Sequence, residues 1–288
     1  MSIEATQLHP LFFARVTGVD FSRAPDAASV ARIVALSDRY GVLAFPETGL
    51  DDARHVAWSR ALGPLELAPH FVGSPTTRRL SLPELFEAGN LGADGEITAP
   101  DNRGRLFARG NKLWHTDSSF NPTLSKYSLL LAYVVPPGGA DTEFADLRAA
   151  YDALPDARKA EIETLEVVHD MWHSRRLAGF PDVTAEQREA KPPVRHRLVH
   201  THPGSKRKSL FMGAHASHIA GWPEDKGRAL LRELTEFATE ARFVHRYEWR
   251  VGDLVMWDNR VSLHRATPFD DFAFRRDMRR TTVIDAAA

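Results

Sequence analysis

The sequence predicts a mixed α+β fold whose core is an antiparallel barrel or jelly roll, with helices flanking it and inserted between its strands. Short β-branched and aromatic runs separated by Gly, Pro and Asp lie at both ends of the chain, as in antiparallel β structures. Segments with apolar residues at helical spacing lie between them. The chain has no βαβ alternation and no Gly-rich phosphate loop, so we do not expect a nucleotide-binding parallel sheet.

The composition suits a single enzyme domain. Hydrophobic residues make up 43% and charged residues 26% of the 288 residues, which is typical of a globular chain with a sizeable core. A β-rich domain of this length needs no internal boundary, and we find no repeat. We therefore expect one domain over residues 1–288.

The individual elements follow from the same signals. β-branched or aromatic runs predict strands at residues 13–19, 42–45, 127–135, 142–144, 209–212, 243–249, 253–257 and 278–284. Apolar residues at helical spacing predict helices at residues 27–39, 51–62, 146–153, 157–165 and 224–239. Gly41 and Gly63 stop the first two helices, and Asp51 is a suitable cap for the second. The turn Pro136-Pro137-Gly138-Gly139 predicts a hairpin-like reversal between the strands on either side of it.

Residues 70–109 are rich in Gly, Asn, Asp and Pro and show little periodicity, as in EAGNLGADGEITAPDNRG. We interpret them as a long mobile loop. Such loops are uncommon in a compact domain and often cover a site, although a disordered insertion has the same composition. The position of this loop directly before the candidate metal ligands favours a lid.

Charge and cysteine content narrow the chemistry. Lys and Arg (37) nearly cancel Asp and Glu (38), so no overall field attracts nucleic acid or an anionic membrane, and an anionic ligand must be bound by local cations. The chain has no Cys. Disulfides, thiolate zinc sites and cysteine nucleophiles are therefore excluded, and His and carboxylates are the remaining strong metal ligands.

The N-terminal segment MSIEATQLHPLFF lacks the basic start and long apolar run of a signal peptide. No stretch approaches the ~18 apolar residues that a membrane span requires. We expect a cytoplasmic protein whose partner is a small molecule and not a membrane or a nucleic acid. The sequence leaves homo-oligomerisation open.

The string WHTDSSF supplies the first two candidate metal ligands. His115 and Asp117 are two residues apart, so on an extended segment their side chains face the same side. A pair this short also arises by chance, and the two side chains could simply hydrogen-bond to each other. A metal site therefore needs a further ligand from elsewhere in the chain.

The string VGDLVMWDNRVSLHRA supplies that ligand, because it places His264 after a predicted strand and a polar turn. Two His and one carboxylate on one face of ferrous iron leave open positions for a chelating cosubstrate and dioxygen. Iron(II) bound by one carboxylate keeps a net positive charge, which attracts the 2-oxo acid end of 2-oxoglutarate. The distal carboxylate of 2-oxoglutarate then needs a cation of its own, since burying it unpaired costs several kcal/mol.

The tract FAFRRDMRRTTV provides cations for this purpose. Arg275 and Arg279 are four residues apart, so on a strand they share one face with Asp277. The guanidinium of Arg275 can form a bidentate pair with a carboxylate. A solvated, Arg-rich surface strand has the same pattern, and Arg279 could instead be a structural partner of Asp277.

Other His pairs could also begin a metal site. His200 and His202 are two residues apart, and His215 and His218 are three apart. Neither pair has a carboxylate at ligand spacing, and no HExxH motif is present, so we expect these to be hydrogen-bonded histidines of the core or surface.

Taken together, these motifs resemble the alpha-ketoglutarate-dependent taurine dioxygenase family. The family pattern is His-x-Asp, a Thr or Ser about 25 residues later, a distal His and an Arg about 11 residues after it. Here Thr142 lies 25 residues after Asp117, and Arg275 lies 11 after His264. The strings NKLWHTDSSF, PPGGADTEFADLRAAYDALP, GAHASH and GDLVMWDNR look like those of the members that act on 2,4-dichlorophenoxyacetate, and the resemblance is thinnest across residues 70–109.

The resemblance implies a double-stranded β-helix (jelly roll) core and a catalytic iron(II) held by His115, Asp117 and His264. It implies that Thr142 and Arg275 bind the distal carboxylate of 2-oxoglutarate, with dioxygen as the second cosubstrate. Substrate-side positions of the family match three further residues, which are Arg279, His202 and Asn111.

The activity implied is hydroxylation of an aryloxyacetate-type carboxylate next to its ether oxygen, as in herbicide degradation. Phenol and glyoxylate would be released, together with succinate and carbon dioxide from 2-oxoglutarate. The same cofactors could instead serve a sulfonate or another small organic acid. Two other protein classes are alternatives, a noncatalytic jelly-roll protein with a structural metal and a zinc-dependent hydrolase.

Overall fold

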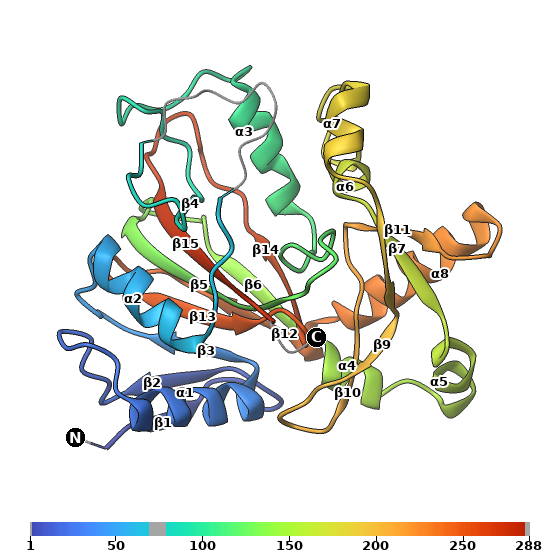
Figure 1. The fold of residues 1–288 in the computed structure, drawn as a ribbon, viewed down its shortest axis with the longest axis horizontal. Coiled ribbons are helices and arrows are strands. Elements are labelled where there is room, and N and C mark those ends of the chain that lie inside the picture. Colours follow the sequence, from blue (N-terminus) through green and yellow to red (C-terminus); the bar gives the residue numbers. More distant parts are fainter. Residues whose placement is uncertain (1, 69–78, 286–288) are drawn as a thin grey trace.

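The structure is a computed structural model that describes residues 2–68 and 79–285. Two facing sheets form its centre, and a mostly helical part lies beside them (Figure 1). The large sheet has the order β1 (Glu4–Gln7), β2 (Ala14–Thr17), β3 (Val42–Phe45), β13 (Leu254–Asp258), β5 (Ser125–Val134), β15 (Asp277–Ile284) and β4 (Phe86–Glu87). The small sheet has the order β12 (Val244–Tyr247), β6 (Thr142–Asp146) and β14 (Ser262–Ala266). All pairs in both sheets are antiparallel except β2 with β3.

The remaining described elements are helices and two short sheets. The short sheets contain β11 (Ala216–Ile219), β7 (Glu166–His169) and β8 (Val194–Arg197) in one, and β10 (Lys208–Leu210) with β9 (Val199–Thr201) in the other. The helices are α1 (Ala27–Tyr40), α2 (Asp52–Leu62), α3 (Arg103–Ala108), η1 (Arg109–Lys112), α4 (Leu147–Asp152), α5 (Asp156–Ile162), α6 (Met171–Leu177), α7 (Ala185–Ala190), α8 (Glu224–Ala238) and η2 (Ala241–Phe243). No described helix has the length and apolar character to cross a membrane.

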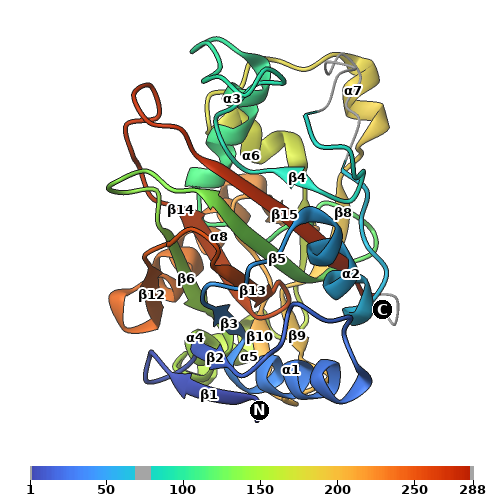
Figure 2. The same ribbon diagram turned by 90° about the vertical axis from the view of Figure 1, so that its left-hand side faces the viewer.

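The large sheet is covered on both faces because its strands alternate two sets of apolar side chains. Leu43 of β3 packs on the side of Ile33 in α1 and Trp58 in α2, and Figure 2 views the molecule from the side on which these helices lie. Val42, one residue earlier, packs on the opposite side with Phe144 of the small sheet. Each such side chain contributes about 1.5–3 kcal/mol through burial, so the two cores fix the register of the strands.

The helical part has its own core. Apolar side chains from α4, α5, α8 and the short sheets pack together there, and the cluster includes Ile162, Val167, Leu210 and Leu231. In Figure 1 this part lies to the right of the two sheets. β11 of this part contacts α6, and α6 contacts η1, which also contacts β14, the strand that carries His264.

Most predicted elements are present, and two expectations are corrected. The turn at residues 136–139 does not close a hairpin, because β5 pairs with β13 and β15 whereas β6 pairs with β12 and β14. The turn carries the chain from one sheet to the other. Local sequence could not reveal this, since both strands have partners that are more than a hundred residues away.

The expected loop at residues 70–109 is only partly without regular structure. Residues 70–78 lie outside the described residues. Beyond them, β4 pairs with β15, and α3 begins at Asn102, whose side chain accepts a hydrogen bond from the backbone N–H of Arg105. The backbone N–H groups of Ala88 and Asn90 donate to the carbonyl oxygens of Met278 and Arg276, so this segment is also held against the edge of the large sheet.

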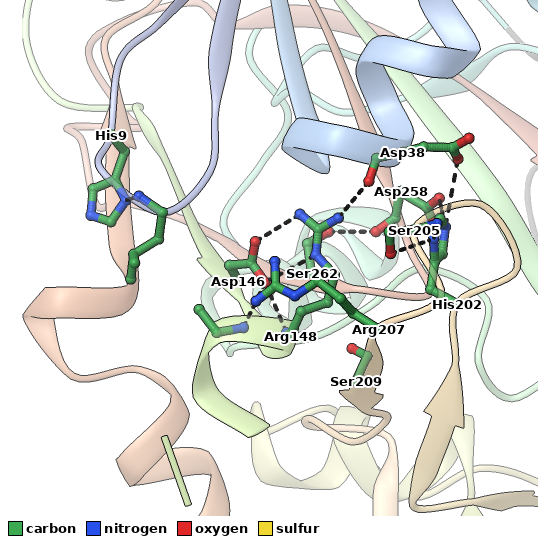
Figure 3. A network of polar contacts seen from close by, with 12 residues as sticks. His9, Asp38, Asp146, Arg148, His202, Ser205, Arg207, Ser209, Asp258 and Ser262 are labelled. Atoms are coloured by element: carbon green, nitrogen blue, oxygen red, sulfur yellow. Dashed lines mark hydrogen bonds and ion pairs between the residues drawn. The ribbon is translucent and has the colours of Figure 1, made fainter. Parts of the chain in front are cut away.

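A network of polar contacts lies between α1, α4 and the ends of β6 and β13 (Figure 3). Arg148 of α4 is fully buried and donates to Asp146 through Nε and Nη2, at 3.2 and 2.8 Å, and to the carbonyl oxygen of Asp38 at 2.9 Å. Asp146 also caps α4. The charge on Arg148 is therefore compensated by partners from α1 and the end of β6.

Replacing Arg148 by Met should destabilise the fold strongly, because Asp146 would remain buried without its cation. We expect Arg148→Met to lower the free energy of unfolding by about 3–5 kcal/mol. Arg158→Met is the control, since Arg158 is partly exposed and pairs with the exposed carboxylates of Glu161 and Glu233, so its loss should cost less than about 1 kcal/mol. Urea denaturation of both variants at one pH measures the difference. Equal losses in the free energy of unfolding would show that burial does not increase the contribution of the Arg148 network.

Candidate active site

Three side chains converge where the small sheet meets the segment before β5. His115 and His264 face each other across an isolated antiparallel bridge, with backbone N–H to O distances of 3.0 and 2.8 Å. His115 Nε2 lies 3.9 Å from Asp117 Oδ1, and His264 Nε2 lies 3.7 Å from Asp117 Oδ2. The three ligand atoms lie within 4.8 Å of one another, and all three side chains are buried. The predicted metal ligands are therefore brought together by the fold.

The protonation states of these groups suit a divalent cation. Nδ1 of His115 lies 2.8 Å from the carbonyl oxygen of Leu113, which can only accept, so Nδ1 carries the proton and Nε2 is free to bind metal. Burial lowers the pKa of His115 and holds that of His264 well below its usual value. Burial would raise the pKa of Asp117, but Arg280 and the two histidines outweigh it and lower that pKa to about 2. The triad therefore offers two neutral imidazoles and one carboxylate, a donor set that suits iron(II).

Asn259, in the turn between β13 and β14, holds the carboxylate ligand in place. Its Oδ1 accepts from the backbone N–H of Asp117 at 3.1 Å and from the indole of Trp257 at 3.0 Å. Its Nδ2 donates to Ser128 Oγ at 3.0 Å, and Ser128 Oγ donates to Asp117 Oδ2 at 2.7 Å. The amide thus fixes both the backbone and, through Ser128, the carboxylate of Asp117.

A cavity of about 610 Å³ opens onto His115 and Asp117. Apolar side chains, among them Phe86, Phe107, Phe120 and Met171, line it together with the guanidinium groups of Arg175 and Arg280. The segment from 79 to 108 forms much of one wall. Such a cavity has the size and mixed lining of a site for a small anionic molecule that also carries an apolar group.

The predicted roles of Arg275 and Arg279 do not fit the structure, because neither side chain lines the cavity. Arg275 is half exposed and pairs with Glu96 at 2.5 Å, outside the cavity. Arg279 lies on the α2 side of the large sheet, where it pairs with Asp52 at 2.6 Å and Asp277 at 3.0 Å and stacks on Tyr133. The structural partnership with Asp277 that the sequence left open is the observed one.

Their neighbours Arg276 and Arg280 face inward instead. Successive residues of FAFRRDMRRTTV face opposite sides of the chain, so Arg276 and Arg280 lie on the side opposite Arg275 and Arg279. Arg280 donates to Asp117 Oδ1 and lines the cavity. Arg276 is buried in an adjoining pocket of about 180 Å³ that also contains Asn111 and Thr267.

Arg276 has no carboxylate of its own among the described residues. Its Nη1 donates to the carbonyl oxygen of Ala88. Burial lowers the pKa of Arg276 to about 10, against the effect of Asp141, which is already paired with Arg246 at 2.5 Å. A buried guanidinium without a carboxylate is a ready partner for an anionic ligand.

Thr142 lies on the small sheet beside the strand that carries His264, and Asn111 lies in η1. The register pairs Phe144 with His264 and Thr142 with Ala266, so the side chain of Thr142 shares a sheet face with the metal ligand. Thr142 Oγ1 accepts from the indole N–H of Trp249 at 3.0 Å, which leaves its hydroxyl proton free to be donated. Asn111 lines both the large cavity and the adjoining pocket.

His202 does not reach the cavity, so its predicted substrate role is wrong. The backbone N–H of Ser205 donates to His202 Nδ1 at 3.0 Å, and Nε2 lies 3.0 Å from Asp258 Oδ2 (Figure 3). The side chain is fully buried in this network. His202 is therefore a structural residue that binds the end of β13 to the β9–β10 hairpin.

The other His pairs are not a second metal site. Within residues 2–68 and 79–285, the triad is the single group of three or more His, Asp or Glu side chains close enough to hold an ion. His200 stacks on Phe211, with ring centroids 4.7 Å apart. His215 lines the cavity with its ring centroid 6.1 Å from that of His115, a position that the sequence pattern did not reveal.

Comparison with known proteins gives the family of the chain. Residues 4–282 match the family described as "Taurine catabolism dioxygenase TauD, TfdA family". The chain is 46% identical over 287 residues to the alpha-ketoglutarate-dependent 2,4-dichlorophenoxyacetate dioxygenase of Cupriavidus pinatubonensis, covering 100% of this chain and 99% of that protein. It is 33% identical to the (S)-phenoxypropionate/alpha-ketoglutarate-dioxygenase of Sphingobium herbicidovorans, covering 93% and 91%. The crystal structure of AAD-2 in complex with Mn(II) and N-oxalylglycine has a TM-score of 0.91 and 42% identity, covering 99% of this chain and 98% of that chain.

The chain belongs to the TauD/TfdA dioxygenase family. It is an enzyme that uses iron(II), 2-oxoglutarate and dioxygen, as the sequence predicted, and its His-Asp-His triad supplies the donors for the metal. The mixed α+β fold is that of the family. The alternatives of a noncatalytic metal protein and a zinc hydrolase are set aside by this membership.

Asn259 gives a direct test of how the triad is positioned. Asn259→Ala removes the acceptor for the Asp117 backbone and the donor to Ser128, so we expect Mn(II) affinity to fall by about 10- to 100-fold. Titration of the apoprotein with Mn(II), following free Mn(II) by electron paramagnetic resonance, measures this without turnover. Asn121→Ala is the control, because Asn121 bonds to Glu66 and Lys191 but not to the ligands. An unchanged affinity in Asn259→Ala would contradict the positioning role.

Proposed function

We propose that the enzyme hydroxylates an aryloxyacetate-type carboxylate at the carbon next to the ether oxygen. The hydroxylated product is a hemiacetal, whose C–O bond to the ring oxygen breaks to give a phenol and glyoxylate. One oxygen atom of dioxygen enters the substrate and the other enters succinate, with carbon dioxide leaving from 2-oxoglutarate. The metal, when bound, supplies the dioxygen activation that couples these two oxidations.

The observation that carries this proposal is that an apolar cavity also contains guanidinium groups beside the metal ligands. An aromatic ring fits among Phe86, Phe107, Phe120 and Met171, and a carboxylate fits the cationic end that contains Arg280. Relatives at 46% and 33% identity are named for 2,4-dichlorophenoxyacetate and (S)-phenoxypropionate, which both have this combination of ring and carboxylate.

Arg280 and Asn111 are the substrate-side residues in this proposal. Arg280 replaces Arg279 in the role first predicted, because it lies on the inner face of β15 and lines the cavity. Its bond to Asp117 keeps the guanidinium beside the metal ligands. A substrate carboxylate held there would keep the neighbouring carbon close to the metal.

For 2-oxoglutarate we propose that Arg276 and Thr142 bind the distal carboxylate, with Arg276 in place of Arg275. Arg276 is a buried cation without a carboxylate, and Thr142 offers a free hydroxyl proton on the sheet face of His264. The AAD-2 structure contains N-oxalylglycine, which has the two carboxylates and the oxo group of 2-oxoglutarate. Two charged or hydroxyl donors would compensate the distal carboxylate on burial.

We further propose that the chain forms one dioxygenase domain with a double-stranded β-helix core made by the two facing sheets. Their shared core, which includes Phe144 and Trp257, supports this description. Residues 79–109 act as the cover of the cavity, because many of their side chains line it. The cytoplasmic location and a homo-oligomeric state remain predictions.

The substrate class can be tested with the anaerobic complex of the enzyme with iron(II) and 2-oxoglutarate. We expect phenoxyacetate to perturb the visible charge-transfer band of the chelate and, after oxygen is admitted, to give phenol and succinate in equal amounts. Taurine is the comparison substrate. A response to taurine but not to any phenoxyacetate would replace the aryloxyacetate proposal with a sulfonate one.

Arg275 and Arg276 allow a matched pair of variants to test the proposed 2-oxoglutarate site. Arg276→Met should raise the KM for 2-oxoglutarate by at least about 30-fold, because it removes the buried ionic partner. Arg275→Met removes a half-exposed arginine that pairs with Glu96 and should leave that KM within about twofold. Steady-state succinate release measures both, and the reverse pattern would restore the original assignment of Arg275.

A further inference from the structure

One charged group in the cavity has no partner among the described residues. Arg175, on α6, is 7% exposed. Its Nε–H has no hydrogen-bond acceptor, and no described carboxylate lies within ion-pairing distance of its guanidinium. Burying a cation in this way costs several kcal/mol unless a ligand compensates it.

The surroundings hold this guanidinium in place. Its Cζ lies 3.9 Å from the centroid of the Phe107 ring. On another side lies Gly110, where an added Cβ would come within 1.6 Å of Arg175 Nη1. A side chain at position 110 would therefore displace the group, and glycine leaves the space for it.

The charge of Arg175 is retained at neutral pH. Burial lowers its pKa to about 10, the nearby charge of Arg280 lowers it further, and the carboxylate of Asp117, which forms no ion pair with it, acts in the opposite direction. Arg280 has Asp117 as a partner, and Arg276 lies in the adjoining pocket proposed for 2-oxoglutarate. The remaining unpaired charge in the large cavity belongs to Arg175, and the remaining anion of the reaction is the substrate.

We propose that Arg175 is a second substrate-binding cation, which together with Arg280 binds the carboxylate of the substrate. The inference rests on the proposed function, which supplies the carboxylate. Two guanidinium groups from different parts of the fold, α6 and β15, then fix the position of the substrate's anionic end. The apolar residues that line the same cavity receive the ring.

The test compares Arg175→Met with Arg176→Met. Arg176 is the next residue on the same helix, but it is 42% exposed and its contact with Asp170 is 3.6 Å long. Phenoxyacetate is titrated into the anaerobic iron(II) and 2-oxoglutarate complex, and the perturbation of the chelate band gives the dissociation constant. We expect Arg175→Met to weaken phenoxyacetate binding by at least about 30-fold. Arg176→Met should stay within about twofold of the unmodified enzyme.

Two further measurements separate a binding role from a structural one. The dissociation constant for 2-oxoglutarate should not change in Arg175→Met, and the neutral analogue 2-phenoxyethanol should bind both proteins equally. Gly110→Ala retains the charge but displaces the guanidinium, so it should also weaken phenoxyacetate selectively. It provides the test if Arg175→Met does not fold.

The failures of the two proposals differ. If phenoxyacetate does not perturb the band of the unmodified enzyme, the proposed substrate class is wrong. If it does, and Arg175→Met and Gly110→Ala bind it normally, the role of Arg175 is wrong. Selective loss of 2-oxoglutarate affinity in these variants would also overturn it, because Arg175 would then belong to the cosubstrate site.

Discussion

Two backbone hydrogen bonds join His115, on the segment before β5, to His264 on β14. They set two imidazoles side by side, although 148 residues separate them in the chain. Asp117 lies two residues after His115, at the start of a turn, and its carboxylate oxygens lie 3.9 and 3.7 Å from the Nε2 atoms of the two imidazoles. The facing sheets, the turn that holds Asn259 and the hydrogen bond from Ser128 all serve to keep this arrangement in place. The remainder of the site is arranged around a metal position that these contacts define.

The second organising feature is the placement of buried positive charge. Arg280 is paired with the carboxylate of the triad, whereas Arg175 and Arg276 are buried without a carboxylate of their own among the described residues. In contrast, Arg148 is paired with Asp146 at 2.8 Å, and Arg260, in the turn after β13, is paired with Asp258 at 2.6 Å and with Asp285 at 2.9 Å. The arginines that are paired with a carboxylate stabilise the fold, whereas those without one are available to bind an anionic ligand. The proposed reaction, which brings together the two anions 2-oxoglutarate and a substrate carboxylate, would account for the unpaired ones.

Sequence alone predicted the metal site and much of the secondary structure. The cap at Asp51, the stop at Gly41 and the apolar periodicity of α1 are local signals, and the structure contains each of them. The His-x-Asp pair and the distal His were recognisable because the chemistry of iron restricts the residue types. The pairing of β5 and β6 with different sheets was not predictable, because it depends on partners distant in the chain.

The arginines between residues 275 and 280 show most clearly what the sequence alone could not predict. Successive residues of a strand face opposite sides, so each Arg-Arg pair offers one arginine to each side, and the sequence does not say which side faces the cavity. Counting 11 residues from His264 selected Arg275, which is half exposed, whereas the buried Arg276 is the residue proposed for this role. Arg175 and Asn259 were missed for a related reason. Their significance lies in what they do or do not contact, and this is a property of the folded chain.

An anaerobic crystal structure of the enzyme with Mn(II), 2-oxoglutarate and phenoxyacetate would show directly how the site binds its ligands. We expect one ion bound by His115, Asp117 and His264, the distal carboxylate of 2-oxoglutarate on Arg276 and Thr142, and the phenoxyacetate carboxylate between Arg280 and Arg175. An ion held elsewhere, or a phenoxyacetate bound outside the cavity with both arginines unpaired, would contradict this expectation.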